Sequence, residues 1–174
     1  AANNETREYG TANPTFSPVY NGFRNGDDIT MINKAGDAAF STDATITSDV
    51  DVYDITADVS ALSSKNYQFA ARGNKGKLTI GQATLTVAAE DAEREYGLAN
   101  PTFSPVYAGF RNSEDAGKIN LSGAPGLTTA ATVDSAVGVY DIAADVSALS
   151  SKNYKFIPRG NKGKLTIGQA TLTV

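Results

Sequence analysis

The chain has 174 residues and a net charge of −4, and it contains no cysteine, histidine or tryptophan. Without cysteine there is no disulfide framework and no thiolate chemistry, and without histidine the commonest general base at neutral pH is missing. An acidic surface repels phosphate, so we expect neither nucleic acid nor an anionic membrane as a partner.

Short runs in which apolar and polar residues alternate predict half-buried strands rather than helices. The first run, residues 16–20, contains Pro18, which cannot donate a ladder hydrogen bond and therefore favours the edge of a sheet. Further strands are expected at residues 53–59, 66–69, 77–80 and 84–87.

Turn signals separate these runs. Residues 25–28 (Asn-Gly-Asp-Asp) predict a turn, and residues 73–76 (Gly-Asn-Lys-Gly) predict a hairpin loop between the strand at 66–69 and the strand at 77–80. Ser60 suits the cap of one helical turn over residues 60–65, but no segment sustains a helix of ordinary length. The sequence therefore predicts an all-β fold of small antiparallel modules, β-sandwich-like, with a β-grasp-like sheet as the alternative that would need a crossing helix.

The chain is an internal repeat. A shift of 87 residues aligns it on itself without a gap, and 60 of 87 positions are identical. Of the 27 positions that differ, 17 fall in residues 26–51, which correspond to residues 113–138 of the second copy. Such a segment is typical of a surface loop, either drifting freely or meeting a ligand.

The repeat sets the expected domain organisation. We expect a first module at residues 1–81, a second at 82–168, and at 169–174 a candidate opening strand of a next module. The two-residue link Gly81-Gln82 favours an elongated rod over loosely tethered beads. No apolar run is long enough to insert into a membrane, and the first residues do not form a signal peptide; the repeats favour a fragment of a longer protein.

Several motifs in a fixed order resemble one domain family. In the second copy they are ATLTV at residues 83–87, Tyr96-Gly97, Asn-Pro-Thr-Phe at 100–103, Tyr-Ala-Gly-Phe at 107–110 and Lys-Leu-Thr-Ile at 164–167. The combination resembles the MBG domain of the YG type. The resemblance implies tandem modules of large bacterial surface or secreted adhesins, such as filamentous-haemagglutinin-like proteins, and it supplies no catalytic residues.

The same resemblance places the ATLTV strand at the opening of a domain. On that phase the first module lacks its opening strand, while residues 169–174 provide a surplus one. On this phase we expect residues 169–174 to dock on the open edge of another chain by strand addition. If each domain instead spans residues 1–87 and their repeat, no strand is missing.

Calcium is the one metal for which the sequence offers candidates. The acidic turns supply hard oxygen ligands, as calcium prefers, but they lack the spacing of known calcium loops, so an ordinary acidic turn is the favoured interpretation. The candidate ligands are Asn25, Asp27 and Asp28 in the first copy and Asn112, Glu114 and Asp115 in the second.

The other candidate groups of residues are more typical of a structural role than of catalysis or ligand binding. Asp54 and Asp58 lie on the polar side of an expected strand rather than across a cleft, so they do not form a glycosidase pair. The basic turn at residues 72–77 lacks phosphate-loop spacing, and the tyrosines and phenylalanines are needed to fill the core. We expect no enzyme activity and no other cofactor.

These observations predict a secreted protein of the bacterial cell surface. Its expected role is a semi-rigid adhesin stalk, whose partners are neighbouring repeats of the same polypeptide. The alternative is an adhesion module that binds a glycan or a host surface protein through the variable residues 26–51 and 113–138.

Overall fold

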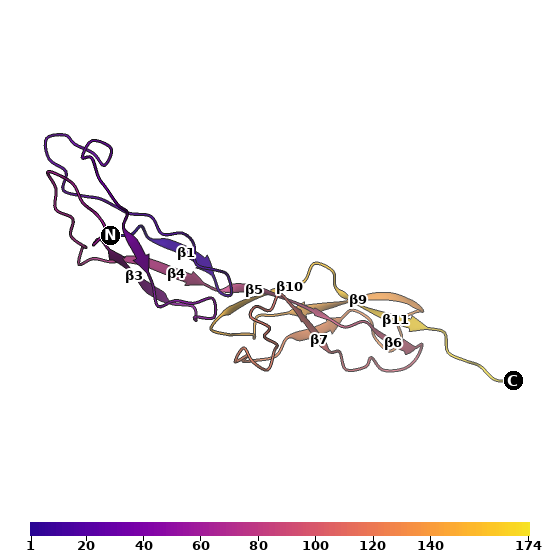
Figure 1. The fold of residues 1–174 in the computed structure, drawn as a ribbon. Helices are drawn as coiled ribbons and strands as arrows, with labels where there is room; N and C mark the ends of the chain where they lie inside the picture. Colours follow the sequence, from indigo (N-terminus) through magenta and orange to yellow (C-terminus); the bar gives the residue numbers. More distant parts are fainter. The chain divides into compact units, whose positions relative to one another are not determined.

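The computed structural model describes all of residues 1–174 and divides them into two compact units, Ala1–Gly81 and Gln82–Val174 (Figure 1). Every regular element is a β-strand, which confirms the predicted all-β class. The first unit contains β1 (Glu5–Glu8), β2 (Ala39–Ser41), β3 (Val52–Asp58) and β4 (Gly76–Gly81). The second contains β5 (Ala83–Ala89), β6 (Ala92–Glu95), β7 (Pro105–Ala108), β8 (Gly126–Thr129), β9 (Gly138–Asp145), β10 (Tyr154–Pro158) and β11 (Gly163–Gly168).

One four-stranded sheet is repeated in both units. Its order is β1-β4-β3-β2 in the first unit and β6-β11-β9-β8 in the second. The first strand of each repeat lies parallel to the last, while the other neighbours are antiparallel. The sheets are therefore mixed rather than wholly antiparallel as predicted, because a connection that spans most of the repeat can bring two strands together in parallel.

Alternating apolar residues on β3 and β4 form the core of this sheet. Ile55, Leu78 and Ile80 are fully or almost fully buried, and so are their counterparts in the second unit. The strands at 53–59 and 77–80 are thus confirmed. The sequence analysis missed β1 and β2, since one is dominated by charged residues and the other is only three residues long.

The second unit has an additional three-stranded sheet in the order β10-β5-β7. Its central strand β5 runs parallel to β10 and antiparallel to β7, and it contacts β9 of the other sheet. The proline at the start of β7 lies on an edge strand, as predicted. Two sheets packed together agree with the predicted sandwich-like arrangement, and no crossing helix of the alternative β-grasp type is present.

The first unit does not form this second sheet. Residues 67–71 and 18–21, which correspond to β10 and β7, contain no strand, and only one isolated bridge joins Ala2 to Pro18. The predicted strands at 66–69 and 16–20 therefore do not form in the first unit. Only their counterparts in the second unit, β10 and β7, are strands. Each of the two segments needs a central strand as its hydrogen-bonding partner, and β5 provides that strand only in the second unit.

Two local predictions are wrong. Residues 73–76 are no hairpin loop, because residues 66–69 form no strand. The matching residues 160–163 join β10 to β11, which belong to different sheets, so they are no hairpin loop either. Residues 60–65 form no helical turn; the Leu62 amide donates to the Val59 carbonyl at 3.0 Å in a single tight turn. No helix in the structure is long and apolar enough to cross a membrane.

Candidate functional site: the variable face and the groove of the first unit

Each unit contains one buried arginine whose hydrogen bonds hold three segments together. In the first unit Arg7 on β1 donates to the Asn13 side chain at 2.7 Å, to the Thr45 carbonyl at 2.5 Å and to the Glu8 carbonyl at 3.2 Å. Asn13 in turn donates to the Ala44 carbonyl at 2.7 Å. Burial lowers the pKa of Arg7. Because its donors are used within the unit, the arginine stabilises the fold rather than forming a binding site.

The second unit repeats this cluster. Arg94 donates to Asn100 at 2.7 Å, to the Thr132 carbonyl at 2.5 Å and to the Glu95 carbonyl at 3.1 Å. The sequence analysis did not single out either arginine. The side chains of β1 and β6 alternate between exposed and buried positions. This alternation is not visible in the sequence as an apolar pattern, because the buried position of each strand holds an arginine.

The Tyr-Gly pair forms the turn that follows β1 and β6. Gly10 and Gly97 adopt φ angles of 74° and 82°, which a residue with a side chain adopts only at a cost. The preceding tyrosine amide donates to the end of β4 or β11, at 2.8 Å from Tyr9 to the Gly81 carbonyl in the first unit. The glycine in this motif therefore has a conformational role.

Two calcium candidates of the first unit, Asp27 and Asp28, are already engaged by protein donors. Residues 25–28 form the predicted turn, with Asn25 and Gly26 at φ angles of 55° and 76°. The Tyr67 hydroxyl donates to Asp27 at 2.6 Å, and this bond raises the pKa of Tyr67. Asp28 accepts from the Thr30 hydroxyl and amide, which lower the pKa of its carboxyl group.

Two candidates of the second unit, Glu114 and Asp115, are engaged in the same way. Glu114 accepts from the Tyr154 hydroxyl, and Asp115 pairs with Lys118 at 3.1 Å, which lowers the pKa of Asp115. Asn112 is in the turn at a φ of 52°. In neither unit are three or more acidic side chains grouped so that they could hold a metal ion.

The carboxylates and lysines near the basic turn neutralise one another. Asp54 pairs with Lys77 at 2.5 Å and with Lys75 at 3.2 Å, and Lys77 is the larger cause of its lowered pKa. Asp141 makes the corresponding two pairs with Lys164 and Lys162. Asp58 accepts from the Ser60 amide at 2.9 Å, which lowers its pKa and fixes the following turn.

The variable segment lies almost entirely at accessible positions. Within residues 26–51 only Ile32 and Ala44 are buried, and within residues 113–138 only Ile119 and Ala131 are buried. Both buried positions are identical in the two copies, while none of the 17 differing positions is buried in either unit. The two copies therefore differ across a surface, which we call the variable face, and keep the same anchors beneath it.

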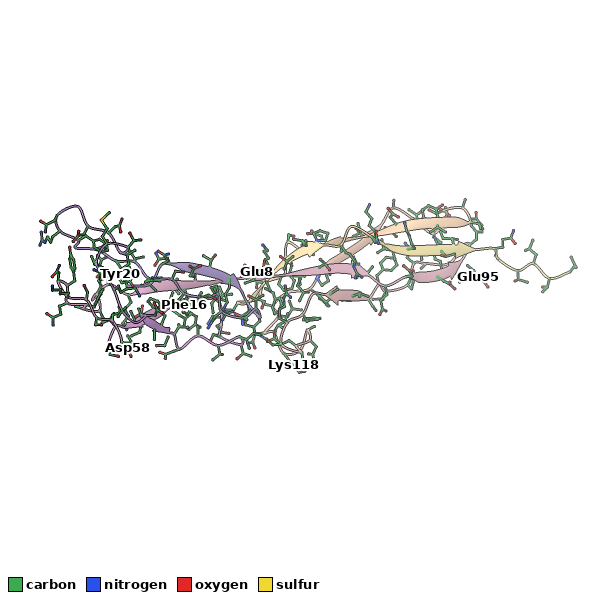
Figure 2. All side chains as sticks on the ribbon, turned by 45° about the horizontal axis from the view of Figure 1, so that its top comes forward. Glu8, Phe16, Tyr20, Asp58, Glu95 and Lys118 are labelled. Carbon is green, nitrogen blue, oxygen red and sulfur yellow. The ribbon has the colours of Figure 1, made fainter.

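The first unit also has an apolar groove. It has a volume of about 100 Å³, and its walls include Tyr20, Phe23, Phe40, Val59, Tyr67 and Phe69. Two edge-to-face pairs, Phe23 with Tyr67 and Tyr20 with Phe69, stabilise its aromatic wall, each with ring centres 6.2 Å apart. Within the unit, Tyr20 lies at the end opposite Glu8, the last residue of β1 (Figure 2).

Comparison with known families agrees with the repeated Tyr-Gly turn and the repeated sheet. The MBG domain family (YGX type) matches residues 1–79 and 85–166. The chain belongs to the MBG domain family. No curated protein and no solved structure matches it. As tandem MBG domains, the two units are repeat domains of the kind found in surface proteins.

Proposed function

We propose that this pair of MBG domains acts as a stalk segment of a bacterial cell-surface adhesin and projects an adhesive region away from the cell. The observation that carries the proposal is the strict repetition of a structural unit. Each repeat has the same sheet and the same buried arginine cluster. Only Gln82 separates the end of β4 from the start of β5, which supports repeats that follow one another without a flexible tether.

The proposal assigns the chain no catalytic step. Asp54 and Asp141 are paired with lysines, and Asp58 accepts from the nearby Ser60 amide, which supports a structural role for these carboxylates. The partners in this role are the neighbouring repeats of the same polypeptide, and the location is the outside of the bacterial cell.

NMR relaxation of the backbone amides tests the stalk proposal directly. A semi-rigid stalk requires the two units to tumble together. The relaxation rates of amides in both units should therefore fit a single anisotropic rotational diffusion tensor. Inserting a flexible Gly-Ser segment after Gly81 provides the matched control, in which the units should tumble separately. Separate correlation times in the unmodified chain would contradict a semi-rigid spacer.

The variable face supports a second function, the binding of a glycan or a host surface protein. Its differences between copies are confined to accessible residues, which is the distribution that ligand contacts would produce. The test is binding of the chain to arrays of glycans and host proteins. A spacer gives no saturable binding, whereas an adhesion module binds one class and loses binding when residues 26–51 are exchanged for residues 113–138.

A further inference from the structure

In each unit the first strand of the four-stranded sheet is hydrogen-bonded to the last. In the second unit β6 lies beside β11, with Ala92 opposite Leu165 (Figure 1). In the first unit β1 lies beside β4, with Glu5 opposite Leu78, which is the same register 87 residues earlier. Both pairs are parallel. The chain therefore enters each pair at one end of the ladder and leaves it at the other end.

This arrangement decides how a pulling force acts on the pair. Tension along the polypeptide pulls β6 and β11 in opposite directions along their length, so the two strands must slide past each other. The hydrogen bonds of a parallel pair are evenly spaced, and sliding loads all of them together. In an antiparallel hairpin both chain ends lie at the same end of the ladder, and tension breaks the bonds one after another. A parallel terminal pair therefore gives the unit a high barrier to forced unfolding.

Two further hydrogen bonds lengthen the ladder between β6 and β11. Before β6, the Asp91 side chain accepts from the Lys164 amide at 2.8 Å. After β6, the Tyr96 amide donates to the Gly168 carbonyl at 2.9 Å. The first unit makes both bonds as well, although an asparagine, Asn4, replaces the aspartate. The two repeats therefore share the additional acceptor rather than its charge.

Both strands of the pair are also held by the rest of the unit. β11 lies between β6 and β9, and its Leu165 and Ile167 are almost completely buried. β6 is an edge strand, but its buried Arg94 donates to the Asn100 side chain and to the Thr132 carbonyl. Water is therefore kept from the buried face of β11, and β6 cannot slide away without withdrawing a buried guanidinium group.

The other sheet of the second unit has the same sense. β5 is parallel to β10, with Ala83 opposite Tyr154. Only Glu90 and Asp91 separate β5 from β6, and β10 is followed by β11. Tension that reaches the unit through Gln82 therefore also loads β5 and β10 by sliding. In both sheets a strand from the beginning of the unit is paired in parallel with a strand near its end.

We propose that the parallel pairs β1/β4 and β6/β11 are mechanical clamps, which allow each unit to bear tension along the polypeptide without extending. Opening one clamp would release the residues between its strands and lengthen the chain by about 25 nm, at up to about 3.6 Å per extended residue. This load-bearing function follows from the topology of a single unit. A flexible join between the units would contradict the stalk proposal and leave the clamps intact.

Single-molecule force spectroscopy in two pulling directions tests the clamp. The chain has no cysteine, so thiol handles can be placed at chosen positions of the full chain. Glu90→Cys with Gln169→Cys makes β6 and β11 slide, whereas Glu90→Cys with Asn161→Cys peels them apart from one end; all three residues are exposed. We expect a several-fold higher rupture force for sliding than for peeling at the same loading rate. Equal forces in the two directions would overturn the clamp and leave the stalk proposal untouched.

Variants in the sliding direction test which contacts carry the load. Asp91→Ala removes the acceptor of the Lys164 amide and should lower the rupture force. Asp91→Asn is the matched control and should keep the force of the unmodified chain, because an asparagine makes this bond in the first unit. An Asp91→Ala variant that ruptures at the unmodified force would contradict the proposal.

A core variant separates resistance to force from overall stability. Leu149 is buried outside the apolar cluster that contains Leu165 and Ile167. Leu149→Ala should lower the free energy of unfolding in urea but leave the rupture force for sliding almost unchanged, because forced unfolding depends on the unfolding barrier. A rupture force that simply follows the free energy of unfolding, with Leu149→Ala weakened more than Asp91→Ala, would show that the parallel pair is not the element that resists tension.

Discussion

The two units differ most in the second sheet, although the segments concerned keep the same aromatic residues in both. Both contain the segments that become β7 and β10 in the second unit, with the same aromatic residues, yet residues 18–21 and 67–71 of the first unit form no strand. The second unit has β5 between the two segments, and the first does not. The comparison teaches that an outer strand of such a sheet forms only when its neighbour is present, because its backbone groups then have partners.

The strongest test of this comparison uses the two copies of the leucine. Leu85→Ala should destabilise the second unit by about 2–5 kcal/mol, because it leaves a cavity around a fully buried position. Leu172→Ala should change stability by less than about 0.5 kcal/mol, since that side chain is exposed. Urea unfolding of both variants measures the difference. Equal losses of stability in the two variants would contradict the burial of Leu85 in β5.

The arginine cluster should affect both units alike. Arg94→Ala and Arg7→Ala each remove donors from buried carbonyl groups and from an asparagine side chain, so we expect a loss of about 3 kcal/mol from the unit concerned. Thermal unfolding followed by circular dichroism measures the loss. The lysine variants keep the charge but lack the planar fork, and they should recover only part of it. A loss confined to one unit would show that the units differ beyond β5.

Substitution of the corresponding glycines Gly22 and Gly109 tests the same difference between the units, with a smaller expected effect on stability. Gly22→Ala and Gly109→Ala share the cost of a positive φ, about 1–2 kcal/mol. Gly109→Ala should cost about a further 1–2 kcal/mol, since the new methyl group lies against the β5 backbone and must displace it. Urea unfolding of the monomers compares the two variants. Equal costs would mean that β5 is not packed against Gly109 in solution.

The surface ion pairs should give a weak pH dependence that is the same in both units. Lys77 first and Lys75 second hold the pKa of Asp54 below its ordinary value, and Lys164 and Lys162 do the same for Asp141. A lowered folded-state pKa stabilises the fold above the unfolded-state pKa, about 4, and this stability is lost as the pH falls through the folded-state value. The unfolding temperature should therefore drop below about pH 4, and less steeply in Asp54→Asn and Asp141→Asn. An unchanged slope in both variants would show that these pairs do not contribute.

Calcium should have the smallest effect. Asp27 and Glu114 accept tyrosine hydroxyl groups, while Asp28 and Asp115 accept local donors, so a cation would have to displace bonds already formed. We expect the same unfolding temperature in millimolar calcium and in a chelator. A rise with calcium that is abolished by Asp28→Asn would instead identify a metal site in the first unit's turn.

Much of the four-stranded sheet could be predicted from the sequence. Alternation at residues 53–59 and 77–80 placed the core residues Ile55, Leu78 and Ile80, because a half-buried strand shows its period directly. Asn25 and Gly26 form the predicted turn, since both tolerate a positive φ. The strand that carries Arg7 was missed because a buried charge disguises the apolar face.

The candidate site depended more heavily on tertiary structure. The sequence marked residues 26–51 as variable, and the structure showed that the variation spares the buried Ile32 and Ala44. It could not show that Asp27 is held by a tyrosine hydroxyl 40 residues further along the chain, at position 67. Contacts between distant residues depend on the strand order, which alternation does not encode.

By itself the sequence determined the repeat of 87 residues, the all-β class and the identity of the two Gln-Ala-Thr-Leu-Thr-Val segments. Only the tertiary structure decided that one of these segments is a buried central strand while the other is exposed. The physical reason is that alternation specifies a side chain's preference for burial, whereas burial itself needs a groove and two flanking backbones. The second unit brings both to residues 82–87, where β10 and β7 lie on either side of β5.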